Sequence, residues 1–184
     1  MAYENVTPKA TTSHAFTRSG THTNTNYGTG PEVYDDDFGT YYGIYSYSSA
    51  SGVTTTTIAT SEHTWVNAIT VPKIKVYVYA AGQAFGNYAQ VNNTVYVDLK
   101  VSSVWTRVDT ATRGGSATSG TLYPTELNDT YTNSGDGWTN VTGIRAYTSG
   151  SAFNYEGATT TRGYSYIYEM QCFQFVKKSF SGVI

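Results

Sequence analysis

The stretch KIKVYVYA at residues 73–80 decides the fold class, because its side chains alternate strictly between two kinds. Ile74, Val76, Val78 and Ala80 are apolar, whereas lysines and tyrosines occupy the positions between them. A period of two residues is typical of a β-strand with one face in the core and one outside it. We therefore expect a strand here whose aliphatic row packs inward.

The same pattern recurs along the chain from residue 39 onward. TVYVDLKV at 94–101 alternates again, and Ser102-Ser103 is predicted to be the turn of a hairpin. No segment keeps a helical period for long. Residues 111–138 are rich in glycine, and this composition predicts a long loop that contacts a ligand or partner. The expected strands are 41–47, 53–58, 64–71, 73–80, 94–101, 104–110, 140–148 and 162–176. The sequence thus predicts an all-β protein, a single β-sandwich of about eight strands.

Composition excludes several function classes. A net charge of −2 and scattered basic residues give no footprint for nucleic acid, and no segment has the length of a membrane span. Cys172 is the one cysteine, so we expect a buried thiol and no disulfide. The three histidines lack metal-ligand spacing, and no nucleophile motif stands out among the serines. We therefore expect a protein that is not an enzyme and holds no cofactor.

Residues 1–38 form a separate compositional block, and the β-sandwich domain is expected at residues 39–184. The first block is rich in Thr, Asn, Gly and Ser and has too few apolar residues to order alone. Two interpretations stay open, a flexible tail and an extended arm that orders against a neighbouring subunit. Phe16, Tyr27 and Tyr34 are the expected anchors of such an arm.

Two groups of charged residues are candidate structural sites. Asp35, Asp36 and Asp37 could supply oxygen ligands to calcium, although a complete site would need further oxygens, and a solvated linker is the alternative. Glu169 lies in the strand-like segment YIYEMQCF, where alternation places it on the core side. A buried carboxylate requires a partner, so we expect an ion pair between Arg145 and Glu169.

Aromatic side chains are the strongest signal for function, since the chain contains 18 tyrosines. Tyrosine combines a rigid ring with a hydroxyl, which suits both sugars and protein interfaces. Tyrosines at alternate positions of the predicted strands could instead pack within the sandwich. Aromatic residues in predicted loops are better candidates for a ligand or partner contact site: Phe85, Tyr88, Tyr123, Trp138, Phe153 and Tyr155.

Four segments together resemble the galactose-binding-like (discoidin-type) jelly roll. They are ITVPKIKVYVYA, TVYVDLKVSSVWTRV, WTNVTGIRAYTSG and GYSYIYEMQCF, and they lie within residues 64–175. The resemblance implies a β jelly roll, a fold that hosts carbohydrate binders, lipid binders and structural modules. Short jelly rolls with a Thr-rich start are also similar to decoration, head-fibre and tail proteins of tailed bacteriophages. The single cysteine departs from the disulfide that often ties the termini of discoidin-type domains.

Three functions follow as hypotheses. The first is a structural virion protein of a bacteriophage, a capsid decoration, fibre or tail component that forms homo-oligomers and contacts other virion proteins. The second is a carbohydrate-binding or receptor-binding module that recognises surface glycans, and the third is a subunit of an extracellular filament. Residues 1–30 contain no apolar run typical of a signal peptide, so we expect a chain made in a host cytoplasm and located in a virion, with an extracellular location as the alternative.

Overall fold

The computed structural model describes residues 2–7, 10–19, 26–28, 31–35, 37, 39–49, 52–85, 89–154 and 160–176. These residues form eleven strands and a short 3-10 helix, η2 (Pro31–Tyr34). The strands are β1 (Ala2–Asn5), β2 (Thr11–Ser19), β3 (Asn26–Tyr27), β4 (Tyr42–Ser48), β5 (Thr54–Val71), β6 (Lys73–Phe85), β7 (Ala89–Val101), β8 (Val104–Ala117), β9 (Leu122–Thr132), β10 (Trp138–Asn154) and β11 (Thr160–Val176). Nowhere in this described part is a helix long and apolar enough to cross a membrane.

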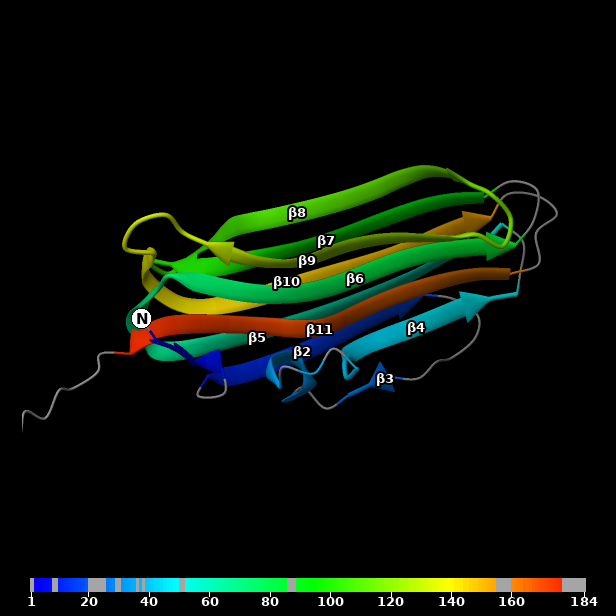
Figure 1. Cartoon of the computed structure of the whole chain (residues 1–184). Coiled ribbons are helices and arrows are strands. Elements are labelled where there is room, and N and C mark those ends of the chain that lie inside the picture. Colours follow the sequence, from blue (N-terminus) through cyan, green and yellow to red (C-terminus); the bar gives the residue numbers. More distant parts are fainter. Residues whose placement is uncertain are drawn as a thin grey trace, which may run out of the picture.

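The strands form two antiparallel sheets that run along the long axis of the molecule (Figure 1). Sheet I has the order β3-β4-β11-β6-β9, and β1 also pairs with β11. Sheet II has the order β2-β5-β10-β7-β8. The eight strands β4 to β11 therefore follow the orders 4-11-6-9 and 5-10-7-8, which is the strand order of a jelly roll. The predicted fold class, an all-β sandwich of the jelly-roll type, is confirmed.

The core between the sheets differs along its length. Near the β7–β8 turn, on the left in Figure 1, the core is aliphatic and includes the fully buried Ile74, Leu99 and Ile144. Toward the opposite end, where β6 leads into β7, buried hydroxyls replace aliphatic chains, and Thr57 Oγ1 lies 3.0 Å from Ser165 Oγ. Small side chains let the two sheets approach closely here. We call these two ends of the sandwich the β7–β8 end and the β6–β7 end.

The N-terminal block differs from the sequence prediction. In its described residues, β1, β2 and β3 pair with β11, β5 and β4 of the same chain, so these strands form neither a tail nor an arm that waits for another subunit. Backbone pairing with existing sheets orders these strands, so they need little apolar surface of their own. Phe16 stacks on Tyr42 at 4.2 Å between ring centroids, and Tyr34 meets His63 edge-on. The backbone of Tyr27 pairs with Gly43, whereas its side chain lies outside the described residues.

The expected long loop at residues 111–138 is also corrected. β8 continues to Ala117, and residues 122–132 form β9 at the edge of sheet I. Pro124 is accommodated because an edge strand has backbone N–H groups that need no ladder partner. The predicted hairpin at Ser102 and Ser103 is present, and both residues have positive φ angles, 48° and 69°. These angles fit a tight two-residue turn between antiparallel strands.

Candidate functional site

The predicted aromatic contact group is only partly brought together. Phe85, Tyr123 and Phe153 lie at the β6–β7 end, at or near the ends of their strands. Trp138 begins β10 at the opposite end, where it packs half-buried against the aliphatic core. Tyr88 and Tyr155 lie outside the described residues. One continuous site therefore cannot include Trp138 together with the other members of the group.

Arginine side chains lie over two of the rings at the β6–β7 end. The Arg162 guanidinium lies 4.8 Å from the centre of the Phe85 ring, and that of Arg113 lies 4.9 Å from the Tyr123 ring. The Tyr123 hydroxyl accepts a hydrogen bond from the backbone N–H of Thr118 at 2.6 Å. These contacts hold the rings in the structure and occupy surfaces that a ligand would otherwise stack on.

The aspartates of the candidate calcium site form a local hydrogen-bonded turn. Asp35 accepts a hydrogen bond from the N–H of Asp37, and Asp37 accepts one from the N–H of Gly39, at 2.9 and 2.8 Å. The Thr40 hydroxyl also donates to Asp35 at 2.8 Å. Asp36 lies outside the described residues, and the described part of the chain contains no cluster of three or more metal-ligating side chains.

The predicted ion pair between Arg145 and Glu169 is wrong. Arg145 lies on β10 in sheet II, and its Nε donates to Asp98 Oδ2 at 2.8 Å. Glu169 is fully buried on β11 in sheet I, where a β-bulge shifts the register between Ile167 and Glu169. The bulge interrupts the alternation on which the prediction relied, so Ile167 and Met170 take the core positions instead.

The outer face of sheet II carries a row of polar residues across all five strands, and four of the five are charged. The strand registers place Ser13, Glu62, Arg145, Asp98 and Arg107 side by side in that order. Asp98 is only 2% exposed and binds the Nε groups of both arginines. Arg145 also lies 4.5 Å from the centre of the Trp105 ring. One carboxylate therefore fixes two guanidinium groups on this face.

The next row across the same face contains two stacked tyrosines. Tyr96 and Tyr147 are register partners, with ring centroids 4.7 Å apart and an angle of 8° between the rings. Arg107 lies 3.5 Å from the centre of the Tyr96 ring, so Tyr96 has a partner on each side. Within the described residues Tyr147 stacks only on Tyr96. Burial raises the pKa of the Tyr96 hydroxyl above its usual value of 10.

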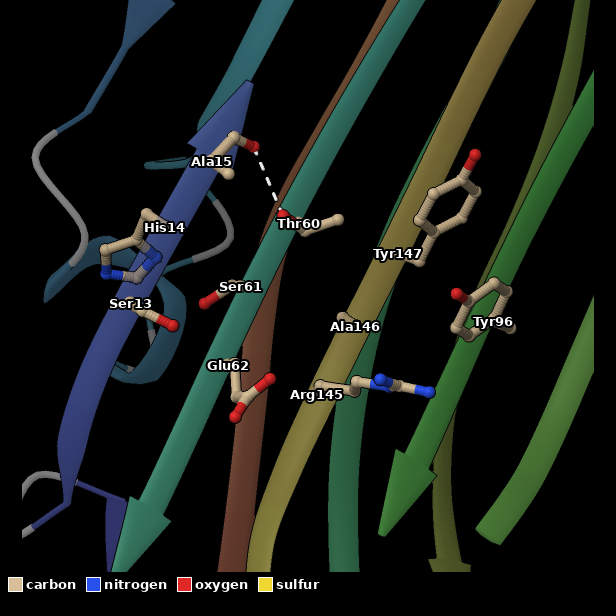
Figure 2. Close-up of a pocket in the computed structure, with 10 residues that line it drawn as sticks. All are labelled: Ser13, His14, Ala15, Thr60, Ser61, Glu62, Tyr96, Arg145, Ala146 and Tyr147. Carbon is tan, nitrogen blue, oxygen red and sulfur yellow. Dashed lines mark hydrogen bonds between the residues drawn. The ribbon is translucent and has the colours of Figure 1, made fainter. Parts of the chain in front are cut away.

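Two hollows meet at this tyrosine pair. The charged hollow, about 210 Å³, is lined by Ser13, His14, Ala15, Thr60, Ser61, Glu62, Tyr96, Arg145, Ala146 and Tyr147, all of which Figure 2 shows. The hydroxyl hollow, about 470 Å³, is lined by Thr56, Asn92, Thr94, Tyr96, Tyr147, Ser149 and Ser151. Tyr96 and Tyr147 therefore separate a region with charged groups from a region whose described residues offer hydroxyl and amide groups.

The outer face of sheet I has a different arrangement of tyrosines. Tyr77 stacks on Tyr168 at 4.4 Å and Tyr79 on Tyr166 at 6.0 Å, with angles of 14° and 13° between the rings. Tyr164 extends this cluster, which we call the tyrosine cluster. Burial and neighbouring tyrosines raise the pKa of Tyr79 and of Tyr168 to about 12. The rings pack on one another on the outside of the sandwich, so they are not part of its core.

Sequence reasoning did not find the site on sheet II. The alternation in TVYVDLKV puts Tyr96 and Asp98 on the face opposite the aliphatic row, which is the outer face of β7, but alternation cannot show which strand lies beside β7. Glu62, Arg145 and Tyr147 become neighbours only through the register of β5 with β10. A pattern of outward polar and aromatic residues on several strands is the one signal that could have indicated this face.

Comparisons with known proteins give likenesses in structure only. No family model and no curated protein sequence matches the chain. The family 32 carbohydrate-binding module of NanJ from C. perfringens, solved in complex with galactose, is similar over 94% of this chain and 100% of that chain. Its TM-score is 0.39 and its sequence identity is 11%.

Two viral structures show weaker likenesses. A chain of the infectious bursal disease virus Gx strain is 14% identical over 92% of this chain, with a TM-score of 0.33. Tailspike protein 4 of bacteriophage CBA120 is 10% identical over 85% of this chain, with a TM-score of 0.28. This chain spans 33% of the first viral chain and 19% of the second. At these values, the likenesses assign neither a family nor a ligand to the chain.

Proposed function

We propose that this chain is a non-enzymatic carbohydrate-binding module and that sheet II carries its binding face. The observation that carries the proposal is Tyr147, which stands between the two hollows and stacks on Tyr96 with one face of its ring. A sugar ring has an apolar face that packs on an aromatic ring and a rim of hydroxyls that needs hydrogen-bond partners. The charged hollow and the hydroxyl hollow offer such partners on both sides of the tyrosine pair.

The stacking platform is rigid before any ligand binds. Arg107, Tyr96 and Tyr147 form a continuous stack, and Asp98 fixes Arg107 from below. A ring that is already ordered loses little conformational entropy on binding, so more of the contact energy is available for affinity. The preformed stack therefore supports Tyr147 as the ring on which a sugar packs.

The carboxylates of the face support binding rather than hydrolysis. Glycoside hydrolysis commonly uses two carboxyl groups on either side of the bond that breaks. Asp98 is buried and already binds two arginines, which leaves Glu62 as the one carboxylate among the described residues that line the charged hollow. The proposal needs no metal or cofactor, and calcium binding at Asp35 to Asp37 stays a prediction.

A glycan array probed with the full chain tests the proposal, followed by affinity measurements on the best ligand. Tyr147→Ala should weaken that affinity by about tenfold, equivalent to about 1.4 kcal/mol, because the stacking surface is lost. Tyr147→Phe should retain most of the affinity, because it keeps the ring. Tyr45→Ala, on sheet I, is the matched control and should bind like the unmodified chain. The proposal is wrong if no glycan binds, or if the alanine variants at positions 147 and 45 behave alike.

The tyrosine cluster favours a second candidate function, a structural subunit of a virus particle, including the bacteriophage components predicted from sequence. Its rings stack on each other across β11 and β6 on the outside of sheet I. Rigid tyrosines of this kind are enriched in protein interfaces. Light scattering of the full chain over a range of concentrations tests self-association. Tyr168→Ala should lower the mass of any oligomer, and a monomer at all concentrations would contradict self-assembly through this face.

A further inference from the structure

We infer that Glu62 sets the class of ligand that the sheet II face accepts: neutral sugars bind, and glycans with carboxylate or sulfate groups are rejected. The inference rests on the proposed carbohydrate-binding function and specifies its substrate class. It makes Glu62 a specificity-determining residue of the charged hollow.

The charges of this face do not cancel pair by pair. Arg107 and Arg145 both bind Asp98, so these three residues together carry one excess positive charge. Glu62 follows in the same row across the sheet and brings the sum of the four residues to zero. Glu62 is therefore the group that offsets the excess positive charge beside the charged hollow. Lys100, whose Nζ lies 5.5 Å from the centre of the Trp105 ring on the same face, does not line that hollow.

Glu62 has open hydrogen-bonding capacity. Figure 2 shows the Arg145 guanidinium extended toward β7 and away from Glu62, in agreement with its bond to Asp98. Within the described residues, no hydrogen bond or ion pair reaches the Glu62 carboxylate. An ionised carboxylate only accepts hydrogen bonds, so a bound molecule must bring donors to it.

Sugar hydroxyls supply such donors, whereas carboxylate and sulfate groups do not. A neutral sugar packed on Tyr147 can donate hydroxyl hydrogens to Glu62 and accept a hydrogen bond from the Ser13 hydroxyl, which lines the same hollow. An anionic group at the same place would offer no donor and would meet a like charge. Discrimination of this kind depends on a repulsive element as well as on attractive contacts.

Removal of the Glu62 charge should abolish the discrimination against anionic ligands. Glu62→Gln keeps the shape of the side chain and leaves the excess positive charge of Arg107, Arg145 and Asp98 exposed to an anionic ligand. The test compares a neutral oligosaccharide that the chain binds with its counterpart oxidised to uronic acid, so that the two ligands differ only in carboxylate groups. Dissociation constants of both are measured for the unmodified chain and for Glu62→Gln.

The unmodified chain should bind the uronate at least fivefold more weakly than the neutral ligand. Glu62→Gln should tighten uronate binding by roughly fivefold or more, which is the factor expected for a charge pair at about 4 Å in water. This gain should disappear at high salt, because exposed charges are then screened. Glu126→Gln on β9 removes the same charge from sheet I and should change neither constant.

Two results would overturn the inference. One is an unmodified chain that prefers the uronate, and the other is a Glu62→Gln variant with the same ratio of neutral to uronate binding as the unmodified chain. If Tyr147→Ala still weakens binding of the neutral sugar, the carbohydrate-binding function stands and only the role of Glu62 is wrong. If the unmodified chain binds no sugar of either kind, both proposals fail.

Discussion

Gly150 on β10 packs tightly against the backbone of sheet I, and Gly150→Ala should force the two sheets apart. A Cβ atom at this position would lie 2.1 Å from the carbonyl oxygen of Tyr164 and 2.4 Å from that of Ala81. Both contacts are with backbone of sheet I, which cannot rotate away as a side chain can. The sandwich would have to open at the β6–β7 end, where Thr57 and Ser165 meet across the sheets.

Two opposing effects set the magnitude. Overpacking of a close contact costs about 1–3 kcal/mol, whereas replacement of glycine by alanine stabilises through the unfolded chain by about 0.4–1 kcal/mol. Gly114→Ala on β8 is a matched control, because its nearest heavy atom, the Val91 carbonyl oxygen, would lie at an ordinary 3.8 Å. Both variants share the unfolded-state effect, so their difference isolates the clash.

Urea unfolding followed by circular dichroism measures this difference. We expect Gly150→Ala to lower the free energy of unfolding by at least about 1 kcal/mol relative to Gly114→Ala. Equal stability of the two variants would refute the reasoning, because it would mean that the sheets do not approach closely at residue 150.

Two further predictions concern buried polar groups. Asp98→Asn should lower the free energy of unfolding in urea by about 2 kcal/mol, because two arginines lose a charged acceptor. The control Asp136→Asn, at an exposed position, should change it by no more than about 0.5 kcal/mol. An Asp98→Asn variant as stable as the unmodified chain would contradict the ion pairs of Asp98 with Arg107 and Arg145. Burial lowers the pKa of His63 from 6.5 to about 3, so the unfolded chain binds a proton that the folded chain does not, and stability should fall as pH falls from 6.5 toward 3. The free energy of unfolding should change by at most about 1.4 kcal/mol per pH unit from this one group. His63→Gln should remove this part of the pH dependence. Identical pH profiles of the variant and the unmodified chain would show that His63 does not contribute.

The sequence predicted the strands with clear alternation and missed those without it. β6 and β7 were found because their inward positions are aliphatic, such as Val76 and Val97. β2 and β9 were missed because edge strands gain order from backbone pairing, which leaves little hydrophobic pattern in their own residues. The false pairing of Arg145 with Glu169 has a similar origin, since a bulge changes which side a residue faces without a clear sign in the sequence.

The candidate site shows what alternation cannot reveal. It indicates the face on which Tyr96 or Asp98 lies, but the neighbours of these residues depend on strand order and register. Loop aromatics were the natural prediction from sequence, yet Arg162 covers the Phe85 ring and Trp138 lies at the other end of the sandwich. Register is set by the whole fold, so the rows of sheet II could only be seen in the structure.

Titration of the isotope-labelled chain with its best array ligand, followed by amide NMR shifts, tests the central claim most directly. We predict that the largest shifts fall on β5, β10 and β7 around Thr60, Tyr147 and Tyr96, which line the hollows of sheet II. The strands of sheet I around Tyr79 should stay unchanged. Shifts concentrated instead at the β6–β7 end, around Phe85 and Tyr123, would contradict a binding face on sheet II and would place the ligand at the end of the sandwich.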